Sequence, residues 1–196
     1  MEMRTDKFHE ECGVIGIYNH PEAANLAYLG LYALQHRGQE GSGIVSYDQQ
    51  TFHIEKGMGL VADVFSKDRL ERLTGSMAIG HNRYSTAGGS DLKNVQPLMV
   101  NFALGTLALA HNGNLTNANF LRDELEAYGA IFQSTTDTEV MIHLIAHSKG
   151  NTLPDRIVDA LRQVKGAYSV IFLSEQGLIG VRDSYGFRPL SLGRKP

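Results

Sequence analysis

The sequence has one cysteine, no tryptophan and no excess of positive charge. Its 196 residues carry a formal net charge of −3 at pH 7. A single cysteine excludes an internal disulfide framework and fits a reducing cytosol. A negative net charge gives no electrostatic reason to expect binding to nucleic acid. We therefore expect a cytoplasmic protein without disulfides and without a nucleic-acid partner.

Long hydrophobic runs are also missing. No stretch approaches the ~20 apolar residues that a membrane-spanning helix requires. The first residues, MEMRTDKFHEE, lack the apolar region of a secretory signal. The hydrophobic content of 42% is nevertheless that of a globular chain, long enough to bury a substantial core. We expect no membrane partner.

The order of the elements predicts the fold class. Hydrophobic patterning predicts strands at residues 13–18, 43–47, 52–56, 77–81, 107–110, 167–173 and 178–182. It predicts helices at residues 22–35, 117–128, 137–147 and 154–164, with Gly38 as the residue C′ that ends the first of them. Strands come first and last, and most of the helices cluster between them. This order favours a layered α+β fold over regular βαβ alternation.

Cys12 lies at the border between a polar leader and an apolar strand. A lone cysteine is often a small buried hydrophobe, and this reading stays open. The alternative is a nucleophile, which needs a base close by. If the chain were cut before Cys12, its own α-amine, with a pKa of about 8, could accept the thiol proton. Residues 1–11 would then be a propeptide.

Asn112 and Gly113 follow an apolar strand. Asn-Gly is first of all a turn signal. In the functional alternative, the Asn112 amide and the Gly113 N–H at the strand end converge on one anionic oxygen.

Two charged residues could bind the two ends of an amino acid. Arg83 follows a strand and precedes a Ser/Gly-rich loop. It is either a solvated charge or a guanidinium that binds a carboxylate, with the loop as a lid. Asp137 begins a helix, where it or Thr136 could cap the first turn. Alternatively, its carboxylate could hold an ammonium group.

Two other polar features of the sequence are weaker indications of a functional site. His143 and His147 have the i, i+4 spacing of a zinc pair but no third ligand at a suitable spacing, so we expect no metal. Residues 38–43 resemble a phosphate loop only loosely, and a close backbone approach to a ligand is the better interpretation.

Seven segments in order along the chain form a recognisable set: CGVIGIY, LQHRGQEGSGI, GHNRYSTAGG, NVQP, LAHNGNLTNA, TTDTEV and GFRPLSLG. Together they resemble the glutaminase domain of the glutamine phosphoribosylpyrophosphate amidotransferase family, which belongs to the class II glutamine amidotransferases. The resemblance implies the N-terminal-nucleophile (Ntn) hydrolase fold, a four-layer αββα sandwich of two mainly antiparallel sheets between helices. It also implies that residues 1–11 are a self-processed propeptide.

The resemblance assigns roles to individual residues. Cys12 would attack the side-chain amide carbon of glutamine while its α-amine moves the proton. Asn112 and the Gly113 N–H would form the oxyanion hole. Arg83 would bind the α-carboxylate of the substrate, and Asp137 its α-ammonium group. Ammonia leaves, and water then hydrolyses the glutamyl thioester.

Further assignments from the resemblance concern the rim of the pocket. Arg37 and Gly38 would lie on the nucleophile's side and contribute to substrate binding. Residues 84–95 would form the lid over glutamine.

The resemblance also implies a larger enzyme. Residues 12–196 would be a C-terminally incomplete glutaminase domain, and a phosphoribosyltransferase domain would follow it. That enzyme would transfer ammonia to phosphoribosyl diphosphate, giving 5-phosphoribosylamine in the first committed step of purine biosynthesis. We expect no cofactor in this chain. For the parent enzyme we expect Mg²⁺, a 4Fe-4S cluster and a homotetramer. The alternatives are the glutaminase domain of another class II amidotransferase and a non-catalytic glutamine-binding module.

Overall fold

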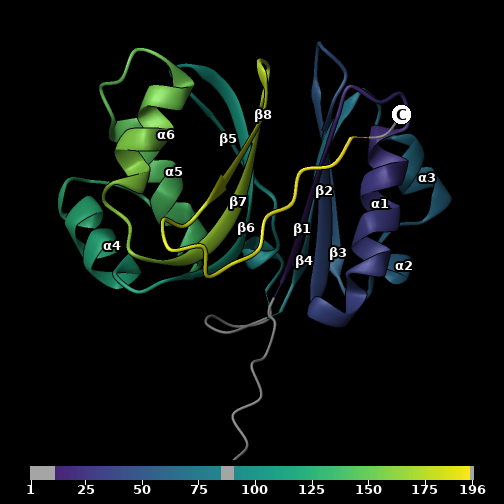
Figure 1. Cartoon of the computed structure of the whole chain (residues 1–196), viewed down its shortest axis with the longest axis horizontal. Helices are drawn as coiled ribbons and strands as arrows, with labels where there is room; N and C mark the ends of the chain where they lie inside the picture. The colour runs from purple at the N-terminus through teal and green to yellow at the C-terminus, as the bar shows by residue number, and fades with distance from the viewer. Residues whose placement is uncertain (1–11, 85–90, 195–196) are drawn as a thin grey trace, which may run out of the picture.

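The computed structural model describes residues 12–84 and 91–194 (Figure 1). The predicted propeptide and much of the predicted lid therefore lie outside the described residues. The strands are β1 (Gly13–Tyr18), β2 (Gly41–Tyr47), β3 (Phe52–Met58), β4 (Met77–Arg83), β5 (Leu98–Phe102), β6 (Gly105–Leu115), β7 (Gly166–Ser174) and β8 (Gly177–Arg182). The α-helices are α1 (Ala23–Ala33), α2 (Val61–Val64), α3 (Lys67–Glu71), α4 (Ala118–Ala127), α5 (Thr138–His147) and α6 (Leu153–Leu161). Two 3₁₀ helices are η1 (Gln35–Arg37) and η2 (Leu92–Asn94).

The strands form two four-stranded antiparallel sheets. The first has the order β1-β4-β2-β3 and the second the order β5-β6-β7-β8. In Figure 1 the sheets face each other, with α1, α2 and α3 outside the first and α4, α5 and α6 outside the second. The predicted α+β class and the four-layer αββα arrangement are confirmed.

Alternation along the central strands explains how one strand serves two layers. In β4, Ala78 packs with the helices outside the first sheet, whereas Ile79 packs in the cluster between the sheets. In β6, Ala108 and Ala110 face the first sheet, while Leu109 joins the core beneath α5 and α6. Successive side chains of a strand point to opposite faces, so a strand in the middle of a sandwich is apolar on both.

The second sheet is covered by a larger helical core. Most of α5 is buried, because α5 lies on the sheet with α4 and α6 as neighbours. The apolar positions of α6 follow the helical period, and Thr152 and Asp155 form a capping box at its start. Among the described residues, no helix is long and apolar enough to cross a membrane.

Several predicted boundaries were wrong. Gly38 does not end the first helix in a left-handed conformation, because α1 stops at Ala33, η1 intervenes, and Gly38 is extended with φ −166°. The strand predicted at residues 107–110 continues to Leu115, so Asn112 and Gly113 lie within β6 and form no turn. The edge strand β5 and the short helices α2 and α3 were not predicted, since each is too brief to show a clear period.

Candidate active site

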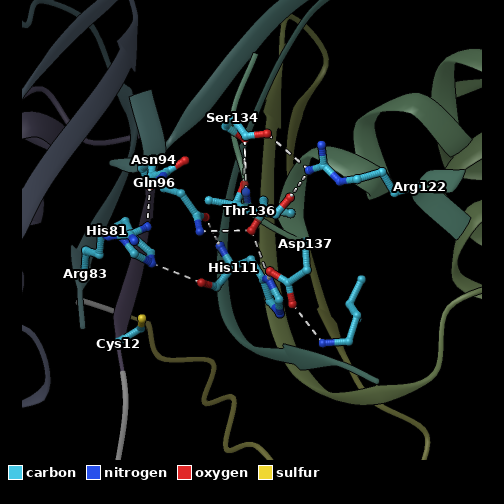
Figure 2. Close-up of polar contacts among 12 residues, drawn as sticks. Cys12, His81, Arg83, Asn94, Gln96, His111, Arg122, Ser134, Thr136 and Asp137 are labelled. Carbon is cyan, nitrogen blue, oxygen red and sulfur yellow. Dashed lines mark hydrogen bonds and ion pairs between the residues drawn. The ribbon is translucent and has the colours of Figure 1, made fainter. Parts of the chain in front are cut away.

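A cavity of about 290 Å³ brings together residues from both halves of the sandwich. Its wall includes Cys12, Arg83, Gly113 and Asp137, four of the residues assigned from the sequence. Figure 2 shows Cys12, His81 and Arg83 on one side, with His111, Asp137 and Arg122 on the other. Asn112, Arg37 and Gly38 are not part of this wall.

Strand alternation explains why these side chains converge. Val14 of β1 and Ile79 of β4 point into the space between the sheets. Arg83 lies an even number of residues from Ile79 in β4, so it shares that face, and Cys12 directly precedes β1 and lies in the cavity wall. Asn82, on the opposite face of β4, instead donates from Nδ2 to the Leu31 carbonyl oxygen of α1, at 2.7 Å.

Cys12 has a backbone conformation that is unusual for its residue type. Its φ is +58°, in the left-handed region that side chains with a Cβ avoid. Its Sγ lies 3.5 Å from both the backbone N and the carbonyl oxygen of Tyr84. The thiol can donate to that carbonyl oxygen and accept from that N–H, so the end of β4 fixes the position of the sulfur.

Arg37 contacts the backbone of the predicted nucleophile. Its Nε donates to the Cys12 carbonyl oxygen at 2.7 Å, and its side chain is buried. Gly38 permits this arrangement, because a Cβ there would lie 2.8 Å from the carbonyl carbon and oxygen of Arg83. The close backbone approach predicted for residues 38–43 is thus made to the chain itself: Gly38 lies against β4, and a Cβ at Gly43 would overlap the Gln96 carbonyl oxygen.

Asn112 and Gly113 lie side by side in β6, opposite Ser169 and Tyr168 of β7. Asn112 continues the face that Ala110 turns toward the first sheet, the sheet that Cys12 precedes. Its Oδ1 is buried and has no hydrogen-bond partner among the described residues. A buried amide left in this state costs stability, which is typical of a group kept for function.

Arg83 is almost fully buried at the end of β4. Its Nη1 donates to the Asn94 carbonyl oxygen at 2.9 Å, and its Nε lies 3.8 Å from Oε2 of Glu40. These contacts hold the guanidinium in the cavity wall. They exclude the alternative of a solvated surface charge.

Asp137 stands at the start of α5 but its side chain does not cap the helix. Its Oδ2 instead accepts from the Leu115 N–H at 2.8 Å, and its Oδ1 lies 3.6 Å from Nδ1 of His111. Burial acts to raise the pKa of Asp137, but the hydrogen bond and charge of His111 and the backbone donors hold it below the usual value. The carboxylate therefore stays ionised in the cavity wall.

A buried polar network in the cavity wall was not predicted. His81 is fully buried, and its Nε2 lies 3.0 Å from the His111 carbonyl oxygen. Burial outweighs that hydrogen bond and lowers the pKa of His81 to about 3, so the ring is neutral. Among described residues, Nδ1 of His81 and Nε2 of His111 have no hydrogen-bond partner. The sequence signal was present: each histidine directly follows an apolar stretch and begins the polar end of its strand.

The segment before Asp137 is held from two sides. Nη2 of Arg122 donates to the carbonyl oxygens of Ser134 and Thr136, at 3.2 and 3.1 Å. The Glu139 carboxylate accepts from the N–H groups of Gln133 and Ser134, at 2.8 and 2.6 Å. These bonds fix the backbone that leads into the helix, and with it the position of Asp137.

The histidine pair considered for zinc serves other contacts. The ring of His143 packs against Phe132 with 4.3 Å between centroids, and its Nε2 lies 3.9 Å from Oε1 of Glu139. Within the described ranges, no group of three or more potential ligand residues is placed to hold a metal ion.

Comparison with known proteins places this chain in a class. Residues 81–196 match the glutamine amidotransferase domain family, and the chain belongs to that family. Within it, the chain is similar to amidophosphoribosyltransferases: 54% identical over 97% of its length to amidophosphoribosyltransferase 3, chloroplastic, of Arabidopsis thaliana, and 53% identical over 96% to the enzyme of Rhizobium etli. The chain spans only 36% and 38% of the length of these two relatives.

A solved structure supports the same relationship. The glutamine phosphoribosylpyrophosphate amidotransferase from B. subtilis, complexed with ADP and GMP, superposes with a TM-score of 0.88 at 47% identity. The match covers 93% of this chain and 39% of that one. The resemblance derived from the sequence motifs is confirmed.

Proposed function

We propose that this chain is a glutaminase that releases ammonia from the side-chain amide of glutamine. The observation that carries the proposal is the cavity in which a thiol, a guanidinium, a carboxylate and a strand glycine meet. A cation and an anion in one wall suit the carboxylate and ammonium of an amino acid. The thiol can act as the nucleophile in amide cleavage.

Specific groups of the chain carry out the steps of this glutaminase reaction. After cleavage before Cys12, the new α-amine takes the thiol proton, and Sγ bonds to the amide carbon of glutamine. The carbonyl oxygen becomes an oxyanion, which the Asn112 amide and the Gly113 N–H stabilise. Collapse of this intermediate breaks the C–N bond, and the departing nitrogen takes the proton as ammonia. Water then cleaves the thioester, giving glutamate and regenerating the thiol.

We further propose that the released ammonia serves an amidophosphoribosyltransferase reaction in a longer protein. Support comes from relatives at 53–54% identity that carry this name and are well over twice as long as the chain. The acceptor would be phosphoribosyl diphosphate and the product 5-phosphoribosylamine, at the entry to purine biosynthesis. A cytoplasmic homotetramer is part of the same proposal.

The donor groups of this chain do not fit the two cofactors expected of the parent enzyme. A 4Fe-4S cluster is held by four thiolates, and the chain has one cysteine. Acidic and histidine side chains do not gather into a metal site in the part of the chain that the structure describes. No step is therefore assigned to Mg²⁺ or to a cluster in this chain, and both remain proposals for other parts of the parent enzyme.

The first prediction tests the glutaminase. The mature protein should have Cys12 as its first residue by intact mass, and a diazoketone analogue of glutamine should add once per chain, at Cys12. Cys12→Ala should abolish glutamate release while leaving thermal unfolding unchanged. Cys12→Ser is the matched control, since its hydroxyl has a similar shape but is a weaker nucleophile.

Two results would contradict the proposal. Turnover near the wild-type rate in Cys12→Ala would favour the non-catalytic binding module. Full activity in a protein that retains residues 1–11 would remove the role of the α-amine.

A further inference from the structure

The NVQP segment begins at the end of the predicted lid, and neither of its amide side chains has a role of its own in the family resemblance. In the structure, Asn94 and Gln96 are both buried, although asparagine and glutamine are mostly surface residues. Figure 2 shows their side chains between the two halves of the cavity wall. A buried amide needs hydrogen-bond partners, so its partners show what it connects.

Asn94 connects Arg83 to the segment that carries Asp137. Its carbonyl oxygen accepts from Nη1 of Arg83 at 2.9 Å. Its side chain makes a reciprocal pair of bonds with Thr135: Nδ2 donates to Oγ1, and Oδ1 accepts from the backbone N–H, both at 3.0 Å. One residue therefore bonds to the guanidinium and to a point two residues before the carboxylate.

This bridge matters because no single element holds Arg83 and Asp137 together. Arg83 ends β4 in the first sheet, whereas Asp137 precedes α5, which packs on the second sheet. Apart from the contact between His81 of β4 and the His111 carbonyl oxygen of β6, their spacing would otherwise depend on how the two sheets pack through an apolar interface. A hydrogen-bonded bridge fixes the distance between the two charged groups more closely than apolar packing does, because hydrogen bonds are directional.

We propose that Asn94 is a positioning residue that fixes the spacing between the Arg83 guanidinium and the Asp137 carboxylate. The inference rests on the proposed function, in which these groups hold the carboxylate and ammonium of one amino acid. The carboxylate and the ammonium group of an amino acid are bonded to the same α-carbon, so both contacts form together only at one spacing. Asn94 thereby makes the site selective for α-amino acids.

Gln96 also helps to position Asp137, through a hydrogen bond on the C-terminal side of that residue. Its Oε1 accepts from the His111 N–H at 2.8 Å, and its Nε2 donates to Oγ1 of Thr138 at 3.0 Å. It therefore ties β6 to the first residue of α5, next to Asp137. The two amides of NVQP hold the two ends of the segment that contains the carboxylate.

The experiment compares ligands that have both charged groups with ligands that have one. Asn94→Ala and Thr135→Val are made in the full protein, the second removing only the hydroxyl of the bridge. Glutamine turnover gives kcat and KM, and calorimetry gives Kd for L-glutamate. Glutaramate, which lacks the α-amine, and 4-aminobutanamide, which lacks the α-carboxylate, are tested as competitors.

If Asn94 sets the spacing, Asn94→Ala raises KM for glutamine and Kd for glutamate by about tenfold, while kcat falls less. Thr135→Val keeps the bond from its backbone N–H to Asn94 Oδ1 and raises both constants in the same direction by a smaller factor. The inhibition constants of glutaramate and 4-aminobutanamide stay within about twofold of their wild-type values, because each of these ligands has one charged group and makes only one of the two contacts. The double variant is no worse than Asn94→Ala alone, since both changes break one bridge.

Ser148→Ala is the matched control. The Ser148 hydroxyl also joins two segments, donating to Oδ2 of Asp159 at 2.8 Å and accepting from the Gly150 N–H at 3.1 Å. None of these three residues lines the cavity. Its loss should lower the melting temperature without changing KM or the preference for two-ended ligands.

Unchanged KM and unchanged ligand preference in Asn94→Ala would overturn the inference while leaving the glutaminase intact. If Asn94→Ala does not fold, Thr135→Val decides by the same measurements. A wild-type protein that neither hydrolyses glutamine nor binds glutamate would refute the proposed function instead, and the inference with it.

Discussion

At the scale of single residues, Asn112 has the most specific chemical expectation. Its Oδ1 is buried without a partner in the described structure, so this oxygen gains no hydrogen bond from folding. We predict that Asn112→Ala lowers kcat for glutamine by about 10²–10³-fold, the usual cost of losing one oxyanion donor. KM and the melting temperature should change little, and steady-state kinetics with calorimetric unfolding measure all three.

The opposite pattern would assign Asn112 a different role. A rise in KM at constant kcat would make the residue a ground-state binder. A large loss of stability with unchanged kinetics would make it a structural member of β6.

Single-residue chemistry was the most predictable part of the site. Cys12, Arg83, Gly113 and Asp137 were assigned from sequence motifs, and all four line the cavity. The residues that hold them in place were not assigned. Asn94 finds its side-chain partner 41 positions further along the chain, and such pairings arise only when the two sheets have packed.

At the scale of elements, Gly113 shows why the Asn-Gly pair belongs to a strand and not to a turn. It lies inside β6 with φ +145°, and a Cβ there would overlap the Ala167 carbonyl oxygen of β7. Only glycine permits both features. The Asn-Gly pair therefore marks a close contact between neighbouring strands, which explains why interpreting it as a turn was wrong.

Gly113→Ala should be strongly destabilising, and Gly129→Ala is its matched control. Gly129 also has a positive φ, +89°, but a Cβ there meets nothing within 4 Å. The control should lose about 1–2 kcal/mol from left-handed backbone strain alone. Gly113→Ala should lose about 1–3 kcal/mol more from the clash with β7. Equal losses in denaturant titrations would show that β7 yields to the added methyl group.

Element order was predictable, whereas element ends were not. A long strand such as β7 shows as a continuous apolar run in the sequence, and an amphipathic helix such as α6 shows its period clearly. The end of β6 does not, because the residues after Ala110 are polar. They are polar because they face a cavity and its buried network, and hydrophobic periodicity carries no signal for such positions.

At the scale of the whole molecule, the cavity depends on two sheets meeting at their polar ends. Farther along the same strands, the sheets meet through apolar side chains such as Val45, Ile79, Ala110 and Leu173. Beyond Ile79, β4 continues with the buried polar residues His81 and Arg83. The interface between the sheets is thus apolar over most of its area and polar at the site. The buried polar end should therefore make the stability of the fold depend on pH.

The final prediction concerns acid stability and His81. Burial, opposed by the hydrogen bond to the His111 carbonyl oxygen, lowers the pKa of His81 from 6.5 to about 3. Between these two values the unfolded chain binds a proton at this position and the folded protein does not. Stability therefore falls as pH drops below about 6.5, at up to about 1.4 kcal/mol per pH unit, and this contribution levels off near pH 3.

His81→Gln removes this titration while keeping an amide that can donate to the His111 carbonyl oxygen. Asp137, whose pKa is also lowered, titrates in both proteins and loses its contribution only as pH falls below the usual carboxyl range. Urea unfolding between pH 7 and 4.5 should therefore show a steeper loss of stability in the wild type than in His81→Gln. Parallel curves would mean that the folded protein protonates His81 in place, with Nδ1, which has no partner among the described residues, taking the proton.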